Sequence, residues 1–452
     1  MTKILVSFIA FIMTISATYA QTLEERVLPL RERAKVEGDL LKHRLDTLVP
    51  ELMRREGVDA WVIISREYNE DPVLKTMLPA TWLSARRRTV LIFLDHGGDK
   101  GVERLAAARY GVTDIFEGSW NPEEQPDQWK RIAEIMDGFD PKKIALNYSD
   151  DWAHADGLTY SEQRDFVSNL PDRLRTRIVS AEKIAVGWLE TRTDKEMEVY
   201  EDVMEIAHGI IAEGFTGKVV TPGVTTRDDL VWWFRQRIND LGLQTWFHTS
   251  IAAERSDASI ANIEANNLDP NVLYQGDHVH IDFGISYLDL QTDTQQNAYI
   301  LRNGETDAPD DLKYALKRGN DLQDMLTGNF QVGRTGNEIL ALTRAQSIAN
   351  DIGPIIYTHP IGLHGHAAGT TIGMWDKQEG VPGSGDYPMH ANTAYSIELT
   401  ALVDIPNWSA KPMRILLEQD GFYDGTNFRY IAGRQTEYHI IDPVDAVTGG
   451  TQ

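Results

Sequence analysis

The stretch "HIDFGISYLDLQTDTQQ", residues 280–296, carries acids in a segment that otherwise has the pattern of a buried strand. Asp282 stands between Ile281 and Phe283, and Asp293 follows after a short turn-like segment. An ionised carboxylate without a partner is costly in an apolar interior, so buried acids are normally paired or bound to a metal ion. The rest of the chain must therefore supply a partner for Asp282.

The alternation around Asp282 indicates a half-buried strand. His278, His280 and Asp282 fall on one face, and the apolar residues between them fall on the other. Residues 284–290 can form a turn that returns Asp293 towards Asp282. Two carboxylates on one hairpin face repel each other unless a cation lies between them, so the pair indicates a cation site. The alternative is a surface hairpin with solvated acids.

Three histidines lie together in "YTHPIGLHGHAAGTTIG", residues 357–373: His359, His364 and His366. Imidazole is a common ligand for first-row metals, and the glycines allow close approach of the backbone. The alternative is a loop with surface histidines.

Two glutamates follow in apolar strand-like segments. Glu398 lies in "TAYSIELTALVDI" (393–405), and Glu418 lies in "MRILLEQDGF" (413–422). Either glutamate alone could face solvent from an alternating strand. Together with the earlier residues they give the order Asp, Asp, His, Glu, Glu.

This order and spacing resembles the "pita-bread" metallopeptidases, the family of methionine aminopeptidases, Xaa-Pro aminopeptidases and prolidases, and the resemblance extends from about Leu23 to the C-terminus. "LETRTDKEMEVYEDVMEIAH", "VTPGVTTRDDL" and "QGDHVHIDFG" are similar to segments of the family's catalytic domain. The resemblance implies an α+β fold, with a pita-bread catalytic domain preceded by a smaller, creatinase-like α/β N-terminal domain.

The resemblance also implies roles for the individual residues. Asp282 corresponds to the terminal aspartate ligand and Asp293 to the bridging one. Glu398 corresponds to the first glutamate ligand and is also the expected proton shuttle, and Glu418 corresponds to the bridging glutamate. The family's ligand histidine is followed by two residues and a glycine, so "GHAAG" makes His366 the expected ligand.

His364 is the alternative ligand, and His359 and His364 are the expected catalytic donors. Three positions depart from the family pattern. A substrate-binding histidine is expected about seventeen residues before Asp282, where the chain has Glu264 and Ala265. A histidine is expected seven residues after the ligand His366, where the chain has Gly373. The usual "TRT" after the second aspartate is replaced by "TQQ", residues 294–296.

The ligand types predict the metals and the chemistry. Four carboxylates and one imidazole suit two divalent ions, with manganese preferred and zinc, cobalt or iron as alternatives. Such a centre lowers the pKa of a bridging water, giving a metal-bridging hydroxide, and stabilises the tetrahedral intermediate of amide hydrolysis. A cation would also explain the burial of Asp282.

The composition limits the classes of partner and metal ligand that the protein can have. The chain has 452 residues, a formal net charge of −24 and no cysteine. The negative charge argues against nucleic acid and anionic membranes. Without cysteine, disulfides are impossible and a metal site must use histidine and carboxylates. We expect a small peptide or another small molecule as the substrate, and the family resemblance implies a homo-oligomer.

Residues 1–20 have the pattern of a signal peptide. Lys3 precedes an apolar run from Ile4 to about Ala17, and Thr18 and Ala20 fit the small-residue positions before a cleavage site. The alternative is an uncleaved membrane anchor, for which the run is short. We therefore expect an exported protein, periplasmic or secreted, with no stable membrane insertion after cleavage.

The remaining pattern predicts two domains, at residues 21–185 and 186–452. Helical spacing runs over 23–56, buried strands are expected at 58–65, 88–95 and 142–149, and further helices are expected at 189–215 and 221–243. Thr193 and Glu196 form a capping-box pattern. After Leu243 we expect strands, turns and long loops, in a largely antiparallel sheet.

The function hypothesis is an exported dinuclear metallohydrolase, an Xaa-Pro aminopeptidase or dipeptidase. One alternative is a hydrolase of non-peptide amides, C–N bonds or phosphoesters on the same fold. The other is a metal- or peptide-binding pseudoenzyme without turnover.

Overall fold

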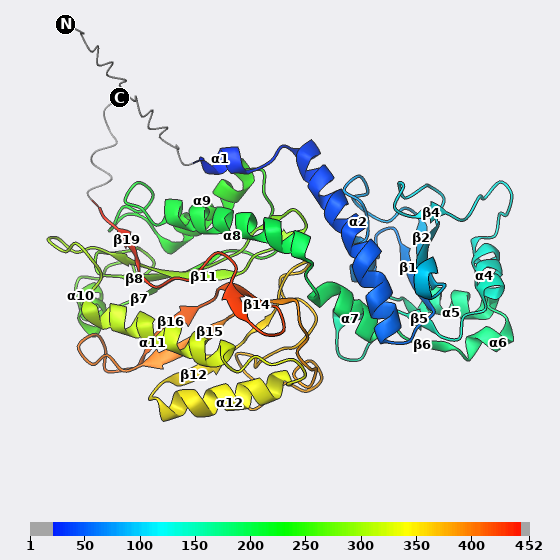
Figure 1. Ribbon diagram of the computed structural model, residues 1–452. Helices are drawn as coiled ribbons and strands as arrows, with labels where there is room; N and C mark the ends of the chain where they lie inside the picture. Colours follow the sequence, from blue (N-terminus) through cyan, green and yellow to red (C-terminus); the bar gives the residue numbers. More distant parts are fainter. Residues whose placement is uncertain (1–20, 444–452) are drawn as a thin grey trace, which may run out of the picture.

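The N-terminal part of the chain is built on a mixed six-stranded sheet (Figure 1). The structure is a computed structural model that describes residues 21–443. The elements of this part are α1 (Leu23–Arg26), α2 (Leu30–Arg55), β1 (Ala60–Arg66), α3 (Pro72–Lys75), β2 (Arg88–Asp95), β3 (Val102–Ala107), β4 (Glu117–Gly118), α4 (Gln128–Phe139), β5 (Ile144–Leu146), α5 (Tyr160–Asn169), α6 (Asp172–Arg175), β6 (Ile178–Ser180) and α7 (Glu182–Glu190).

The sheet has the strand order β4-β3-β2-β1-β5-β6, with α2 and α7 packed together beside it. The three predicted strands are confirmed as β1, β2 and β5, and the predicted signal peptide lies outside the described residues. The helix predicted over 23–56 is interrupted at residues 27–29, because a proline disfavours helical backbone at the residue before it: α1 ends at Arg26, and α2 begins at Leu30, directly after Pro29.

The C-terminal part contains the remaining elements. They are α8 (Asp194–Gly214), α9 (Arg227–Asp240), β7 (Ser250–Glu254), α10 (Asp257–Ala265), β8 (His278–Phe283), β9 (Ser286–Tyr287), β10 (Leu290–Gln291), β11 (Thr294–Ile300), α11 (Asp310–Thr327), α12 (Gly336–Ala349), β12 (Gly353–Ile356), β13 (His359–Pro360), β14 (Thr393–Ser396), β15 (Leu399–Val403), β16 (Met413–Leu417), β17 (Asp420–Tyr423), β18 (Phe428–Tyr430) and β19 (His439–Ile441).

Two helix pairs enclose the strands of this part (Figure 1). The buried apolar side chains of α8 and α9 share a core with β8, while those of α11 and α12 share a core with β15 and β16. The sheets have the orders β19-β11-β8-β7, β12-β15-β16 and β13-β14-β17-β18, and all but one of their pairings are antiparallel. This arrangement confirms the predicted α+β class.

The capping box predicted at the start of α8 is present. The Glu196 backbone N–H donates to Thr193 Oγ1 over 3.3 Å, and the Thr193 N–H donates to the Glu196 carboxylate over 2.7 Å. Each bond satisfies an N–H that the first helical turn leaves free. Glu196 is buried and is also paired with Arg44 of α2 and with Arg192, so the cap ties the two parts of the chain together.

The prediction of strands and loops after Leu243 is wrong for three segments. Residues 257–265, 310–327 and 336–349 form α10, α11 and α12. Leu312, Leu316 and Leu326 of α11 are buried against the sheet at helical spacing, and Thr335 caps α12 with Glu338. The predicted domain boundary after residue 185 falls inside α7, whose residues pack in the N-terminal core, and the two-domain division stays an interpretation.

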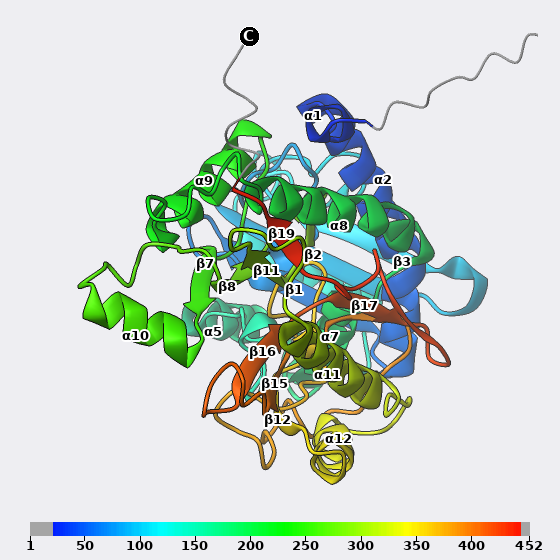
Figure 2. The same ribbon diagram turned by 90° about the vertical axis from the view of Figure 1, so that its left-hand side faces the viewer.

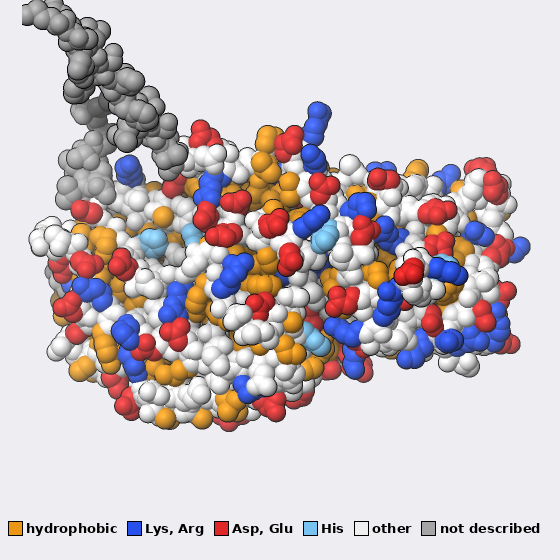
Figure 3. Space-filling view, viewed as in Figure 1, with side chains coloured by type: hydrophobic (Ala, Val, Ile, Leu, Met, Phe, Trp, Pro, Cys, Tyr) orange, Lys and Arg blue, Asp and Glu red, His pale blue; other side chains and the backbone are white. Residues whose placement is uncertain are grey.

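The hydrophobicity of the described helices and the charge of the surface indicate which partners the protein can have. None of the helices between residues 21 and 443 is long and apolar enough to span a bilayer. On the face shown in Figure 3, Asp and Glu side chains are spread over both parts of the molecule, in keeping with the net charge of −24.

Candidate active site

The strand pair β8–β11 brings the two predicted aspartates together. In the antiparallel register Asp282 lies opposite Gln295, and Asp293 precedes the first residue of β11. The predicted alternation is confirmed, because Val279 and Ile281 lie in the core while Asp282 lies on the opposite face of β8. Asp282 and Asp293 therefore share a side of the hairpin.

The two predicted glutamates lie where strands end. Glu398 lies between β14 and β15, and Glu418 lies between β16 and β17. A bridge joins the second of these junctions to the hairpin, since the Gln295 backbone N–H donates to the Glu418 carbonyl over 3.0 Å. The short strands on either side of each glutamate belong to different sheets, so the acids lie where the sheets meet.

His359 of β13 faces this acid cluster. Its Nε2 lies 3.8 Å from Asp293 Oδ2 and 3.6 Å from Glu418 Oε1. Its Nδ1 lies 3.0 Å from the Pro360 carbonyl, which can only accept a hydrogen bond. Nδ1 therefore carries the proton, and Nε2 points its lone pair at the acids, as in a metal-binding imidazole.

Potential ligand atoms lie within 4.8 Å of one another in three groups. The groups are Asp282, Asp293 and Glu418; His359, Glu398 and Glu418; and Asp293, His359 and His366. Asp293 and Glu418 each belong to two of the groups. The structure therefore brings together all the acids that the sequence predicted, with His359 among them.

Burial and mutual repulsion govern the charges of the cluster. Burial, followed by the charge of Glu418, raises the pKa of Asp282, Asp293 and Glu398 well above the ordinary carboxyl values. Burial also raises the pKa of Asp420, whose Oδ2 accepts the Asp293 backbone N–H over 3.2 Å. The site is thus strongly unfavourable for its own ionised acids unless a cation is present.

The unpaired atoms fit a divalent metal. Asp282 Oδ1, Asp293 Oδ1 and His359 Nε2 are buried without a hydrogen-bond partner in the described part of the chain. Buried polar atoms are normally paired, so three unpaired atoms on residues of the overlapping donor groups indicate a ligand. Carboxylate oxygens with one imidazole nitrogen form a donor set for manganese, zinc, cobalt or iron.

The geometry favours His359 over the predicted His366 as the imidazole ligand. His359 belongs to two of the three groups and is buried, whereas His366 is exposed and belongs to one. The ring of His366 packs against His359 with 4.7 Å between the centroids. His364, the alternative ligand, lies outside all three groups and packs against His154 of the N-terminal part, with 4.7 Å between the centroids.

A sequence signal for His359 was available. His359 is followed by two residues and Gly362, as the family's ligand histidine is, and His366 follows it by seven residues. Taking His366 as the ligand made the seven-residue position Gly373. Both "HPIG" and "HAAG" fit the short pattern, and only the second histidine distinguishes them.

Four further residues of the site were not predicted. Gln295 Nε2 donates to the carboxylates of Glu398 and Glu418. Ser396 Oγ donates to Glu418 Oε1 over 2.6 Å. The ring of Trp246 lies 5.0 Å from that of His366, and Asp420 lies behind Asp293. Hydroxyl, amide and indole groups carry no distinctive spacing, so sequence reasoning had no signal for them except the unusual "TQQ".

The missing substrate-binding histidine has a structural explanation. Glu264 and Ala265, at the expected place, belong to α10, a helix without buried residues that projects at the edge of the molecule (Figure 2). Asp257 at its start accepts the Ala410 backbone N–H over 2.8 Å. The segment that would carry the histidine is therefore a helix attached to the far end of the β15–β16 hairpin.

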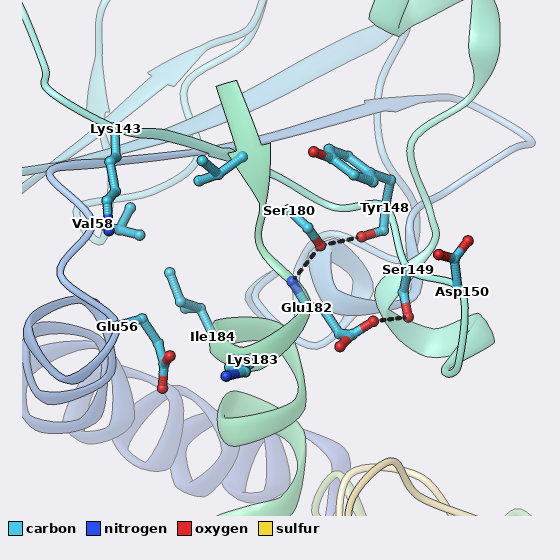
Figure 4. Close-up of a pocket in the computed structure, with 11 residues that line it drawn as sticks. Glu56, Val58, Lys143, Tyr148, Ser149, Asp150, Ser180, Glu182, Lys183 and Ile184 are labelled. Carbon is cyan, nitrogen blue, oxygen red and sulfur yellow. Dashed lines mark hydrogen bonds between the residues drawn. The ribbon is translucent and has the colours of Figure 1, made fainter. Parts of the chain in front are cut away.

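A separate pocket of about 300 Å³ lies in the N-terminal part (Figure 4). Lys143, Lys183, Glu56 and Glu182 contribute charges of both signs to its lining, and Ser149 Oγ donates to Glu182 over 2.7 Å. None of the candidate ligands lines it. We therefore place the chemistry at the acid cluster and not in this pocket.

Comparison with known proteins decides the family. The family model for metallopeptidase family M24 matches residues 199–428, about half of the chain, and this span contains all the candidate ligands. The chain belongs to metallopeptidase family M24. The predicted family and the pita-bread fold are confirmed, and this M24 chain is a metallopeptidase-like hydrolase.

Solved structures of several peptidases have a similar fold over most of this chain. X-Pro aminopeptidase from Thermotoga maritima MSB8 is 16% identical, with a TM-score of 0.59 over 87% of this chain and 99% of that one. Xaa-Pro dipeptidase from Bacillus anthracis is 16% identical, with a TM-score of 0.54 over 91% and 100%. A dipeptidase from Pyrococcus horikoshii OT3 is 16% identical, with a TM-score of 0.55 over 88% and 99%. A search of curated proteins gave no match.

Proposed function

We propose that this M24 chain is an exported, dinuclear metal-dependent peptidase that acts on small peptides, as an Xaa-Pro aminopeptidase or dipeptidase. The observation that carries the proposal is the overlap of the three donor groups, in which Asp293 and Glu418 are shared. Shared carboxylates are what a pair of ions with bridging ligands requires. We assign two divalent ions, with manganese preferred.

The ligands in this proposal are Asp282, Asp293, His359, Glu398 and Glu418. The free Nε2 of His359 and the partnerless oxygens of Asp282 and Asp293 support the assignment. Divalent ions at such a site supply Lewis acidity and a water of lowered pKa. Side chains of the protein carry out the remaining steps of the reaction, which are proton transfer and stabilisation of the oxyanion.

Glu398 is the proton carrier. Its carboxylate belongs to the donor group with His359 and Glu418, so it lies where it can take up a proton from a water and deliver it to the leaving amine. Partial burial and the neighbouring His359 lower the pKa of His366 to about 4, so His366 is neutral at pH 7. A neutral imidazole at the rim of the cluster can donate a hydrogen bond to the developing oxyanion.

Aromatic side chains beside the cluster support a small substrate with an apolar ring. Trp246 and Tyr357 lie with ring centroids 5.0 Å and 5.6 Å from that of His366. Such walls suit the pyrrolidine of proline, since ring packing on an aromatic face adds to simple burial. The names of the structurally similar X-Pro aminopeptidase and Xaa-Pro dipeptidase agree with this substrate class.

Export rests on the signal-peptide pattern of residues 1–20, and we propose a periplasmic or secreted location and a homo-oligomer. Cell fractionation with detection of a mature chain that begins near Gln21 tests the location. A full-length chain retained in the membrane fraction would contradict it.

The decisive experiment combines metal content with a substrate panel. Protein purified without chelator should hold close to two ions per chain by plasma mass spectrometry, and Asp293→Ala should hold fewer and lose turnover. With manganese added, Xaa-Pro peptides should be cleaved. Turnover of non-peptide amides or phosphoesters alone would favour the alternative hydrolase, and tight metal binding without any turnover would favour a binding protein.

A further inference from the structure

The carboxamide of Gln295 lies inside the acid cluster. Gln295 is buried at 4% exposure, and its Nε2 donates to Glu398 Oε1 over 3.0 Å and to Glu418 Oε2 over 2.8 Å. An amide nitrogen has two hydrogens, so these two bonds use both. The residue belongs to "TQQ", the segment in which the chain departs from its family's "TRT".

His280 orients this carboxamide. His280 Nε2 lies 2.9 Å from Gln295 Oε1, which can only accept, so the imidazole carries its proton on Nε2. Turning the amide over would point its oxygen at two carboxylates, where lone pairs would repel. The amide orientation is therefore determined by partners at both of its ends.

The hydrogen bonds leave the glutamates able to bind ions. Ser396 Oγ donates to Glu418 Oε1 over 2.6 Å, and Gln295 donates to Oε2. Each carboxylate oxygen has two acceptor positions, so Glu418 retains one on each oxygen. A donor on each oxygen holds the carboxylate plane without taking the positions that ligation needs.

We propose that His280 and Gln295 act as a positioning pair, in which His280 holds the Gln295 amide and the amide holds Glu398 and Glu418 in the orientation that binds divalent ions. This inference rests on the proposed metal-dependent function. Residues that orient metal ligands typically change metal affinity by about 10–100-fold when they are replaced. The pair therefore gives "TQQ" a role in metal binding.

The next residue of the same strand provides a matched control. Gln296 is buried at 5% exposure, and its Oε1 lies 2.6 Å from Nε2 of His439 on the other face of the sheet. Gln295 and Gln296 thus share residue type, strand, burial and a histidine partner. They differ in that Gln295 alone contacts the acid cluster.

The test is the dissociation constant for manganese, measured by titration calorimetry on metal-free protein. Methionine is close to glutamine in size and cannot donate, so Gln295→Met and Gln296→Met form the pair. Gln295→Met should weaken binding by about 10–100-fold, and Gln296→Met should stay within about twofold of the wild type. His280→Phe should also weaken manganese binding. The double variant should bind manganese as weakly as Gln295→Met alone, because His280 acts through Gln295.

Thermal melting of the metal-free variants separates positioning from a structural role. A structural role alone would lower the melting temperature and leave the dissociation constant unchanged, which would overturn the inference. Tighter binding in Gln295→Met would also overturn it, since the amide would then compete with the ions. If Gln295→Met fails to fold, unchanged affinity in His280→Phe would overturn the pair. Wild-type protein that binds no divalent ion would refute the proposed function as well.

Discussion

Replacing Asp293 by asparagine separates two effects of the carboxylate: the free-energy cost of its buried charge and its binding of a metal ion. The side chain is 3% exposed, and its Oδ1 has no hydrogen-bond partner among residues 21–443. Burial and the charges of Glu418, Asp282, Glu398 and Asp420 raise its pKa well above the ordinary value. Without metal, the folded protein must either hold this carboxyl protonated or bear a repelling charge.

The size of the expected stability change follows from the coupling between protonation of Asp293 and folding. At pH 7 an ordinary aspartate is about three pKa units above its midpoint, and one unit corresponds to about 1.4 kcal/mol. Keeping the carboxyl neutral at pH 7 therefore costs up to about 4 kcal/mol in the free energy of unfolding. Relaxation and sharing of protons among the acids reduce this, so we expect Asp293→Asn to stabilise the metal-free protein by about 1–3 kcal/mol, or about 1–4 °C in melting temperature for a chain of this length.

Added metal should reverse the order of stability of the two proteins, so that the wild type becomes more stable than Asp293→Asn. An ion present at 100 times its dissociation constant stabilises the wild type by about 2.7 kcal/mol. Asp293→Asn removes a charge from two of the three donor groups and should lose most of this gain. Melting is followed by circular dichroism at pH 7 in chelator and in manganese, with the exposed Asp376→Asn as a control that should match the wild type in both.

A lower melting temperature for Asp293→Asn in chelator would refute the claim that repulsion dominates the metal-free site. A full metal-induced shift in the same variant would refute the assignment of Asp293 as a ligand. The two results are independent, so the reasoning on charge and the reasoning on ligation can fail separately.

Three further predictions address the imidazoles, the proton carrier and the domain contact. His359→Ala should lower the number of bound ions measured by mass spectrometry and His366→Ala should not, and the opposite pattern would restore His366 as the ligand. Glu398→Gln should lower kcat for an Xaa-Pro peptide by about 100-fold or more even when metal occupancy is restored by excess manganese, and near-wild-type kcat would exclude its role in proton transfer. Burial raises the pKa of Glu190 to about 8, although Tyr387 donates to it over 3.0 Å. Its stabilising contribution is thus present below about pH 4.5 and is lost as pH rises towards 8. Urea unfolding of Glu190→Gln should show a shallower decline in stability between pH 5 and 8, and an unchanged slope would contradict this.

Local signals predicted much of the fold. The strand at 88–95 and the capped helix after Thr193 were predicted correctly, because apolar runs and capping boxes act over a few residues. The helices α10, α11 and α12 were missed. In α11 the buried residues Leu312, Leu316 and Leu326 have helical spacing, whereas α10 has no buried residues and so no apolar face to indicate a helix.

The sequence by itself determined the family, the α+β class and four acids of the site, Asp282, Asp293, Glu398 and Glu418, since acids in apolar strands are rare unless they have a shared function. The tertiary structure decided which imidazole faces the acids and that Gln295 joins them. Two "H-x-x-G" segments, at His359 and His366, fit the same short pattern, and in the sequence only the histidine seven residues after His359 distinguishes them. Only the pairing of β13 with β14 aims Nε2 of His359 at the cluster. Likewise Gln295 and Gln296 are identical neighbours, and the alternation of side chains along β11 directs one to the acids and the other to His439.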